Sequence, residues 1–167
     1  MANLLFPKEY LNSVYELTPG RLKALKIKTV IFDIDNTLVP YFVKKPTKEV
    51  LDYFDSLKVS GIGIAVLSNS KSKRAEEFCR GLNIPFVSGA KKPLNKGLKR
   101  LMKELSIKPE DVLIIGDQIF TDVLLGNLNG IYSVLVKKVD KKDELITAVK
   151  RPLEKIVLFF YLRRHGK

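Results

Sequence analysis

Five short apolar runs, separated by segments with helical periodicity, constrain the fold of this 167-residue chain more than any other feature. The runs are Val30–Phe32, Ile62–Leu67, Pro85–Val87, Val112–Ile115 and Ile131–Val136. Uninterrupted apolar runs of this length are typical of strands buried on both faces, and the helical segments supply the crossovers that parallel strands require. We therefore predict an α/β fold with three layers, in which helices cover both faces of a central parallel sheet of about five strands.

Helical signals lie between and around these runs. Thr47 is placed to cap a helix whose apolar face includes Val50 and Phe54. The other predicted helices cover 7–18, 72–82, the stretch from Pro93 to about Leu105, 120–128, 140–150 and 152–164. Pro19-Gly20 is expected to end the first of them. No repeat or long linker divides the chain, so we expect a single domain over 1–167.

The single cysteine bears on the cellular compartment. Cys79 has no partner for an intrachain disulfide, and its place in a helical pattern predicts a buried thiol, which fits a reducing compartment. The N-terminus has no basic n-region and only a three-residue apolar run before Pro7, so it lacks the pattern of a secretory signal. We expect a cytoplasmic protein.

The net charge of +12 is unevenly distributed along the chain. Residues 91–108 carry seven basic residues against one glutamate, and residues 137–167 carry ten against four acidic residues, whereas 109–136 hold four acidic residues and no basic one. A basic excess attracts phosphate groups, whether on a nucleic acid, an anionic membrane or a small substrate. The alternative for both clusters is a solvated surface that only aids solubility.

Polar side chains with complementary chemistry follow the predicted strands. In chain order they are Asp33 with Asp35, then Ser68, then Lys92, then Asp117 with Asp122. The carboxyl ends of parallel strands share one edge, where ligands bind. An Asp-X-Asp pair alone is more readily explained as an ordinary polar turn after a strand. Several carboxylates with one lysine and one hydroxyl, and no catalytic histidine or cysteine, indicate a Mg²⁺ site that binds a phosphate oxyanion.

These residues resemble the four motifs of the haloacid dehalogenase (HAD) superfamily, in order and spacing, over nearly all of positions 29–130. Asp33-Ile-Asp35-Asn-Thr37-Leu resembles motif I, Ser68 resembles motif II, Lys92-Pro93 resembles motif III, and Gly116-Asp117-Gln-Ile-Phe-Thr-Asp122 resembles motif IV. Each motif is a weak signal alone, whereas four in order are specific. The resemblance implies a Rossmann-like, HAD-like fold and a phosphatase with Mg²⁺ as its cofactor.

The resemblance also implies a role for each residue. Asp33 would be the nucleophile, whose carboxylate attacks phosphorus and forms an aspartyl-phosphate. Asp35 would act as general acid and base, and an aspartate at this position favours a phosphatase over the superfamily's ATPases, which carry threonine there. Ser68 and Lys92 would hold the phosphoryl oxygens. The expected Mg²⁺ ligands are Asp33, the backbone carbonyl of Asp35, and Asp117.

Several assignments stay open at the level of the sequence. Asp122 could bind the metal, directly or through water, or it could orient Lys92. Lys91 competes with Lys92 for motif III, although the family pattern places the lysine directly before proline. Thr37 and Asn69 are expected to help bind phosphate, but hydrogen bonding within the loop and at the helix start explains them equally well.

The motif spacing leaves no room for a cap domain, because the segments 39–61 and 69–91 are each filled by one predicted helix and its loops. An open site would admit large or surface-bound substrates such as a protein, a nucleic acid or a lipid headgroup. Motifs I and IV with Gly126-Asn127 resemble the capless subfamily III A and its YqeG branch, which is similar to phosphatidylglycerophosphate phosphatases of mitochondria and plastids. Ser70 departs from that pattern, where a second asparagine is expected.

The favoured function is Mg²⁺-dependent hydrolysis of a phosphomonoester, with phosphatidylglycerophosphate or another large, exposed molecule as the substrate. One alternative is a phosphatase of phosphoproteins or nucleic-acid ends. The other is a non-catalytic module that binds nucleic acid or the ribosome. Nucleic acid is the less favoured partner, since no aromatic-basic recognition motif is present and every catalytic position is filled.

The C-terminal stretch 150–167 sets seven consecutive apolar residues, Ile156–Leu162, between basic ends. A bilayer requires roughly 20 residues, so this is no transmembrane helix. As a helix the stretch would be apolar nearly all round, so packing on the domain leaves apolar surface to cover. The alternatives are a terminal helix packed on the core, a homodimer, and peripheral contact with an anionic membrane at its inner surface.

Overall fold

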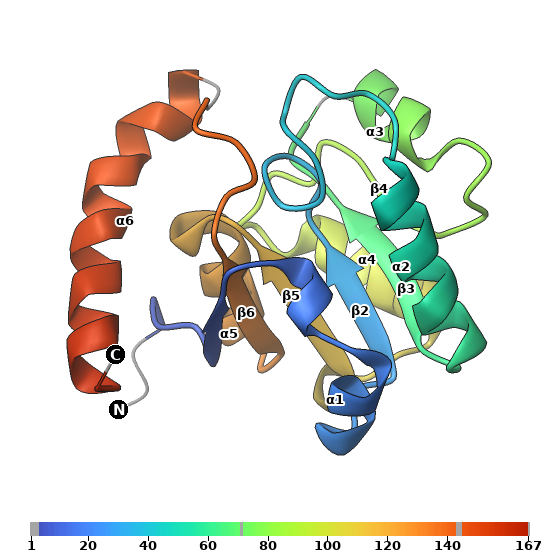
Figure 1. The fold of residues 1–167 in the computed structure, drawn as a ribbon, viewed down its shortest axis with the longest axis horizontal. Coiled ribbons are helices and arrows are strands. Elements are labelled where there is room, and N and C mark those ends of the chain that lie inside the picture. Colours follow the sequence, from blue (N-terminus) through green and yellow to red (C-terminus); the bar gives the residue numbers. More distant parts are fainter. Residues whose placement is uncertain (1–3, 71, 143–144, 167) are drawn as a thin grey trace.

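A parallel sheet forms the centre of the computed structural model, which describes residues 4–70, 72–142 and 145–166. Its strands are β1 (Glu9–Leu11), β2 (Thr29–Phe32), β3 (Gly63–Leu67), β4 (Phe86–Val87), β5 (Val112–Gly116) and β6 (Tyr132–Val136). Across the sheet they follow the order β1-β6-β5-β2-β3-β4, and every pair is parallel (Figure 1). The predicted α/β fold is confirmed, and the carboxyl ends of the strands share one edge.

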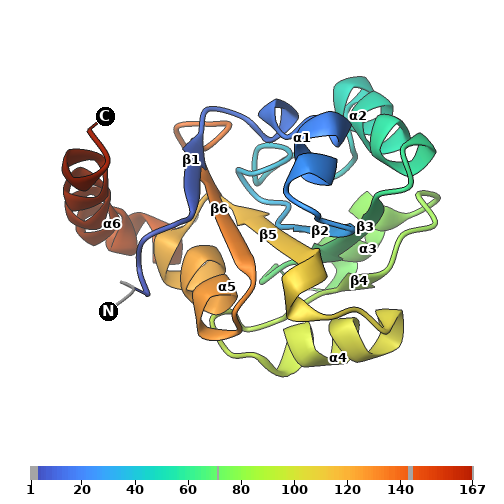
Figure 2. The same cartoon turned by 90° about the horizontal axis from the view of Figure 1, so that it is seen from below.

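Helices cover both faces of the sheet (Figure 2). One face carries α1 (Pro19–Ala24), α2 (Lys48–Val59) and α3 (Ser72–Cys79), and the other carries α4 (Lys96–Leu105) and α5 (Leu124–Leu128). The long α6 (Leu145–Arg164) lies beyond the β1–β6 side of the sheet. Shorter helical turns are η1 (Val14–Glu16), η2 (Pro109–Asp111) and the π-helical η3 (Ile119–Val123).

The strand that delivers Asp33 is buried at the middle of the sheet. All four residues of β2 are buried, since it pairs with β3 on one side and β5 on the other. Val30 and Phe32 join the core beneath α2 and α3, whereas Ile31 joins the core beneath α4. Side chains alternate along a strand, so burial on both faces produces the uninterrupted apolar run seen in the sequence.

The connections that follow β2 and β3 are short. Thr47 caps α2 by accepting a hydrogen bond from the Val50 N–H at 3.3 Å, as predicted. Only the loop 33–46 therefore separates β2 from α2, and α3 fills most of the connection between β3 and β4. Among the described residues, neither connection holds a cap domain. Cys79 in α3 is the expected buried thiol, and burial raises the pKa of that thiol to about 12.

The helix predicted over 7–18 is wrong, because Glu9–Leu11 form β1 and add a sixth strand beside β6. Tyr10 and Leu11 pack in different apolar clusters, as successive strand residues do. Pairing satisfies backbone groups on the β6 edge, for example by the hydrogen bond from the Lys8 N–H to the Ser133 carbonyl at 2.9 Å. Within this segment only the turn η1 is helical.

Two helix boundaries also differ from the prediction. Pro19 begins α1 rather than ending a helix, because the Thr18 side chain caps α1 by accepting from the Arg21 N–H at 3.3 Å. At the other end of the chain, α6 runs continuously through Pro152, where separate helices over 140–150 and 152–164 were predicted. A proline removes one backbone donor, which neighbouring contacts of the helix can offset.

The helix α6 has one packed face and one exposed apolar face. Glu154 and Tyr161 are buried, and Val157 packs in a cluster that contains residues of η3 and β6. The opposite face leaves a set of large apolar side chains more than half exposed, namely Val149, Leu153, Ile156, Phe159 and Phe160. Packing of the terminal helix on the domain therefore accounts for one face only. No helix among the described residues is both long enough and apolar enough to cross a bilayer.

Candidate active site

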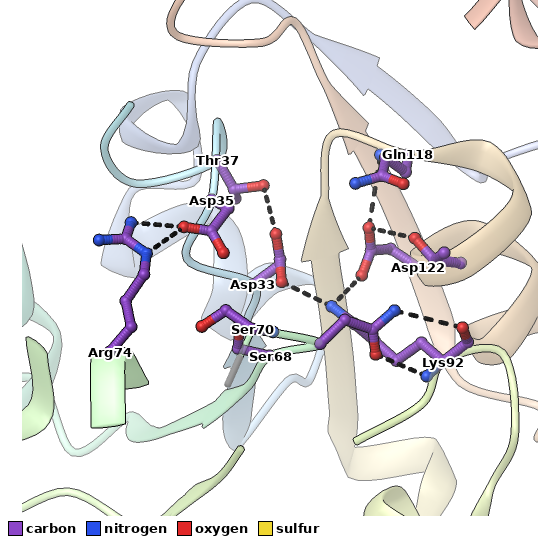
Figure 3. Close-up of polar contacts among 11 residues, drawn as sticks. Asp33, Asp35, Thr37, Ser68, Ser70, Arg74, Lys92, Gln118 and Asp122 are labelled. Atoms are coloured by element: carbon purple, nitrogen blue, oxygen red, sulfur yellow. Dashed lines mark hydrogen bonds and ion pairs between the residues drawn. The ribbon is translucent and has the colours of Figure 1, made fainter. Parts of the chain in front are cut away.

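The polar residues that follow the strands meet at the carboxyl edge of the sheet (Figure 3). They surround a pocket with a volume of about 190 Å³. Its lining comprises Asp33, Asp35, Asn36, Tyr41, Asn69, Ser70, Lys92, Gln118, Thr121, Thr147 and Lys150. The predicted site residues thus come together, although Ser68, Thr37, Asp117 and Asp122 lie behind this lining as buried side chains.

Lys92 joins two of the carboxylates. Its Nζ donates to Asp33 Oδ1 and to Asp122 Oδ1, both at 2.6 Å, and its side chain is 2% exposed. Burial alone would lower the pKa of Lys92, but Asp122 and Asp33 raise it above the ordinary value, so the ammonium stays charged. Lys91 is exposed and does not line the pocket. The structure therefore places Lys92, and not Lys91, beside Asp33.

Hydrogen bonds within the loops position these groups. Asn69 Oδ1 accepts from the Lys92 N–H at 2.6 Å, and Asn69 Nδ2 donates to the Lys92 carbonyl at 3.2 Å. Ser68 Oγ, which is fully buried, accepts from the Ser70 N–H at 3.1 Å. Thr37 Oγ1 donates to Asp33 Oδ2 at a long 3.4 Å. Thr37 and Asn69 thus make the local hydrogen bonds that the sequence offered as an alternative to phosphate binding. Asn69 also lines the pocket.

Three buried carboxylates form a candidate metal site. Asp33, Asp117 and Asp122 present oxygens that all lie within 4.8 Å of one another. Oδ1 of Asp117 is buried and has no hydrogen-bond partner among the described residues. Mg²⁺ and similar hard cations prefer such oxygen ligands, so the donor set fits a divalent cation. The Asp35 side chain is outside this cluster, which is compatible with its expected metal contact through the backbone.

Burial and mutual repulsion raise the pKa values of the clustered carboxylates. Burial raises the pKa of Asp117 to about 7, with Arg151 opposing this rise and Asp122 adding to it. Burial also raises the pKa of Asp33 well above its usual value; Lys92 opposes that shift, and the neighbouring aspartates reinforce it. A bound divalent cation would favour the ionised forms of these groups.

A glycine and a π-helical turn place Asp122. A Cβ at Gly116 would lie 2.1 Å from Asp122 Cγ, so only glycine at the end of β5 lets this carboxylate fold over the strand. Within η3, Thr121 Oγ1 donates to Asp122 Oδ2 at 3.0 Å, and the Gln118 N–H donates to the same oxygen at 3.4 Å. Asp122 bonds Lys92 and belongs to the metal cluster, so the geometry fits both roles that the sequence left open.

Asp35 is held by Arg74, a residue that the sequence did not single out. Arg74 Nε donates to Asp35 Oδ1 at 2.7 Å, and its Nη2 contacts the same oxygen. Arg74 also donates to the carbonyls of Val43 and Pro40, which ties the loop 33–46 to α3. The hydrogen bonds among the described residues leave Oδ2 of Asp35 free. One oxygen of this carboxylate is therefore fixed, and the other is available in the pocket.

The helix α6 supplies a second group of contacts that the sequence did not indicate. Arg151 Nη1 donates to the Asp117 carbonyl at 2.7 Å and to Glu154 Oε2 at 3.0 Å, while Nη2 forms an ion pair with Asp117 Oδ2. Glu154 Oε1 accepts from the Phe120 N–H at 3.1 Å. These contacts hold motif IV at two points. Arg151 sits within a basic tail, and no local pattern distinguishes it from a solvated residue.

Comparisons with known proteins agree with this geometry. The family model described as "Mitochondrial PGP phosphatase" matches residues 3–139. "Probable phosphatase YqeG" of Bacillus subtilis (strain 168) is 36% identical over 166 residues, which cover 99% of this chain and 96% of that protein. Phosphatidylglycerophosphate phosphatase 1 of Arabidopsis thaliana, chloroplastic/mitochondrial, is 31% identical over 157 residues, which cover 86% of this chain and 44% of that longer protein.

Solved structures share the fold. The cobalt-bound deoxy-D-mannose-octulosonate 8-phosphate phosphatase of Haemophilus influenzae has a TM-score of 0.54 at 21% identity, over 83% of this chain and 91% of that one. A Legionella pneumophila protein described as a HAD subfamily III A hydrolase has a TM-score of 0.55 at 20% identity, over 72% of this chain and 71% of that one. At these identities the likeness concerns the fold alone. The chain therefore has a HAD-like fold. Because the family model spans most of the chain and the Bacillus relative spans nearly all of it, the chain belongs to the mitochondrial PGP phosphatase family and is a phosphoric monoester hydrolase.

Proposed function

We propose that the protein hydrolyses phosphatidylglycerophosphate in a Mg²⁺-dependent reaction that passes through a phosphorylated Asp33. The observation that carries this proposal is the buried cluster of Asp33, Asp117 and Asp122 with the Lys92 ammonium bonded to two of its members. Such a cluster combines a nucleophile, metal ligands and a fixed positive charge at one edge of the sheet. The Arabidopsis relative, which is named as a phosphatidylglycerophosphate phosphatase, supports the choice of substrate.

The proposed reaction consists of two successive displacements at phosphorus. In the first, an Asp33 oxygen forms a bond to phosphorus, the bond from phosphorus to the ester oxygen breaks, and Oδ2 of Asp35 gives its proton to the leaving alkoxide. In the second, Asp35 takes a proton from water as that water attacks the phosphorylated Asp33, which releases inorganic phosphate. Lys92 stabilises the charge on the phosphoryl oxygens, and Ser68 is the expected hydroxyl donor.

Mg²⁺ would be held by Asp33 and Asp117, with the Asp35 carbonyl and Asp122 nearby. When bound, it would neutralise the repulsion between the carboxylates and a phosphate dianion. The chain's own part is to keep Asp33 in place. The hydrogen bond from the Asp33 N–H to the Ile115 carbonyl at 3.0 Å fixes the end of β2, and Thr37 bonds the second carboxylate oxygen.

The pocket favours a substrate whose bulk stays outside. A volume of about 190 Å³ admits a phosphoryl group but is below the 300–1,000 Å³ of sites that enclose a whole small molecule. Among the residues that the structure describes, the short connections after β2 and β3 place no cap over it. A lipid headgroup meets these conditions. A phosphoprotein or a nucleic-acid end also meets them, and these are the competing substrates in the test.

The test is a hydrolysis screen of the full chain beside Asp33→Asn. The panel comprises phosphatidylglycerophosphate in mixed micelles, nucleotides, phosphopeptides and sugar phosphates, each with Mg²⁺ and with a chelator. We expect the wild type to prefer the lipid with Mg²⁺ present, and Asp33→Asn to be folded and inactive. A higher kcat/KM for phosphopeptides or nucleotides would replace the lipid as the substrate. Turnover that is unchanged by the chelator, or by Asp33→Asn, would refute the mechanism.

A further inference from the structure

Three exposed apolar side chains lie on loops at the same edge of the sheet as the pocket, and we call them the apolar rim: Phe42, Leu94 and Val139. They are exposed by 54%, 63% and 51% respectively. Phe42 follows β2, Leu94 follows β4 and Val139 follows β6, so all three lie on the carboxyl edge of the parallel sheet. The loop after β2 and the start of α6 lie at the same end of the molecule, at the top of Figure 1.

Each member of the apolar rim adjoins a residue that lines the pocket. The ring of Phe42 contacts that of Tyr41 edge-on, with centroids 5.5 Å apart. The Val139 N–H donates to the carbonyl of Asn36 at 2.9 Å. Leu94 lies two residues beyond Lys92. The rim residues therefore lie on loops that also carry residues of the pocket lining.

Lysines accompany the rim. The exposed lysines of these segments are Lys44 and Lys45 beside Phe42, Lys91 and Lys96 beside Leu94, and Lys141 and Lys142 beside Val139. Lys150, near the start of α6, is also exposed and lines the pocket. Lys44 forms a loose ion pair with Glu77 at 3.9 Å. The sequence after Lys142 continues with two acidic residues, so the positive charge is strongest on the loops after β2 and β4. These lysines would lie between a bound anionic surface and the pocket.

We propose that this edge docks on an anionic phospholipid bilayer, with the apolar rim in the interface and the lysines among the headgroups, so that the pocket opens onto the lipid surface. A soluble polyanion would match the lysines but would leave the apolar side chains in water. Apolar and basic side chains side by side are typical of surfaces that bind anionic membranes. The inference rests on the proposed function, because a small pocket receives only the phosphoryl group and leaves the lipid at the rim.

The test measures sedimentation of the full chain with phosphatidylcholine vesicles that contain or lack phosphatidylglycerol. The variant Phe42→Asp/Leu94→Asp should bind anionic vesicles on the order of tenfold more weakly or worse, since it removes apolar contacts and adds charge. The matched control is Val59→Asp, because Val59 is 90% exposed at the end of α2, on the opposite edge of the sheet. It should bind like the wild type. Binding should also fall as salt rises.

Other variants separate the role of the lysines from that of the apolar rim, and vesicle binding from hydrolysis. Lys44→Glu/Lys45→Glu should weaken vesicle binding without touching the apolar rim, and thermal unfolding shows whether each variant is folded. Rim variants should still hydrolyse p-nitrophenyl phosphate, whereas Asp33→Asn should bind vesicles but not hydrolyse it. If Asp33→Asn hydrolyses it normally while vesicle binding follows the rim, the proposed mechanism fails and the docking surface stands.

Three results would overturn the docking surface. One is equal vesicle binding by the wild type and the rim variants. Another is loss of binding on Phe160→Asp, in the exposed face of α6, with no loss on Phe42→Asp/Leu94→Asp. The third is binding of a single-stranded RNA or a phosphopeptide that depends on Phe42 and Leu94 and exceeds binding to anionic vesicles.

Discussion

Lys92 lies between the buried carboxylates of Asp33 and Asp122, so its charge is fixed beside the proposed nucleophile. A buried ammonium already held by two carboxylates needs no reorganisation when charge develops on a phosphoryl group. Removing it has a second consequence, because the two aspartates would then face each other without a neutralising partner. Lys92 therefore links the stability of the site to its chemistry.

The neighbouring lysines provide a matched pair of variants. Lys92→Ala should lower kcat on the order of a hundredfold or more, because it removes a preorganised charge from the reacting group. Lys91→Ala should change kcat little, since Lys91 is exposed and outside the pocket lining. Steady-state hydrolysis with saturating Mg²⁺ measures both. The opposite ranking would mean that the wrong lysine has been placed in the site.

Arg74 should affect turnover more than substrate binding. Arg74→Ala releases Oδ1 of Asp35 and loosens the loop 33–46, so we expect kcat to fall while KM changes little. Arg74→Lys should restore only part of the activity, because lysine cannot reproduce the guanidinium contacts with Asp35 and the Val43 carbonyl. Asp35→Asn should lose turnover and keep stabilisation by Mg²⁺. If Arg74→Ala matches the wild type in kcat, Arg74 does not position the acid.

The carboxylate cluster predicts how metal-free stability varies with pH. The pKa of Asp117 is raised to about 7 in the folded protein, so its contribution to stability is present at low pH and is lost as the pH rises through that value. Mg²⁺ should restore stability mostly at the higher pH, where its ligands are ionised. Thermal unfolding with a chelator and with Mg²⁺ measures this. Asp117→Asn should flatten the pH dependence; an unchanged profile would contradict the assignment.

Residues at strand ends could be predicted from the sequence, whereas their tertiary partners could not. Asp33, Ser68, Lys92 and Asp117 each follow an apolar run, and a parallel sheet brings such positions together. Arg74 and Arg151 lie on helices, 39 and 34 residues from the aspartates that they bind. Nothing local marks an arginine on a helix as buried against a carboxylate, so these contacts required the structure.

At the scale of elements, β2 could be predicted from the local sequence, whereas β1 depends on a tertiary partner. β2 is a central strand whose buried run is visible in the sequence, whereas β1 has three residues and depends on the free edge of β6. Apolar residues over so short a stretch fit a helical period and a strand equally well. The helix α6 is a second example. It continues through Pro152, and Arg151 and Glu154 on either side of this proline contact motif IV.

These contacts predict that α6 is needed for the site. Arg151→Ala should destabilise the protein by about 2 kcal/mol, because the buried Asp117 carboxylate loses its charged partner. The control is Phe160→Ser on the exposed face, which should change stability by at most about 0.5 kcal/mol. Denaturant unfolding measures both values. Equal stability of Arg151→Ala and the wild type would show that α6 does not support motif IV.

At the scale of the whole molecule, the sheet concentrates its chemistry on one edge. The carboxylate cluster, the lysine and the pocket all lie where the strands end, and the exposed apolar rim lies on loops at the same edge. The basic clusters visible in the sequence did not reveal this, because charge along a chain carries no information on which face it reaches. Alternating strands and helices did predict the common edge.

The most direct measurement of the central claim is mass spectrometry of the protein acid-quenched during turnover with Mg²⁺ and substrate. We predict one phosphoryl group on the peptide that contains Asp33, attached at Asp33 itself, labile to hydroxylamine and lost when substrate is exhausted. Asp33→Asn should show no label and no turnover. A phosphoryl group on another residue, or normal turnover of Asp33→Asn, would contradict the account.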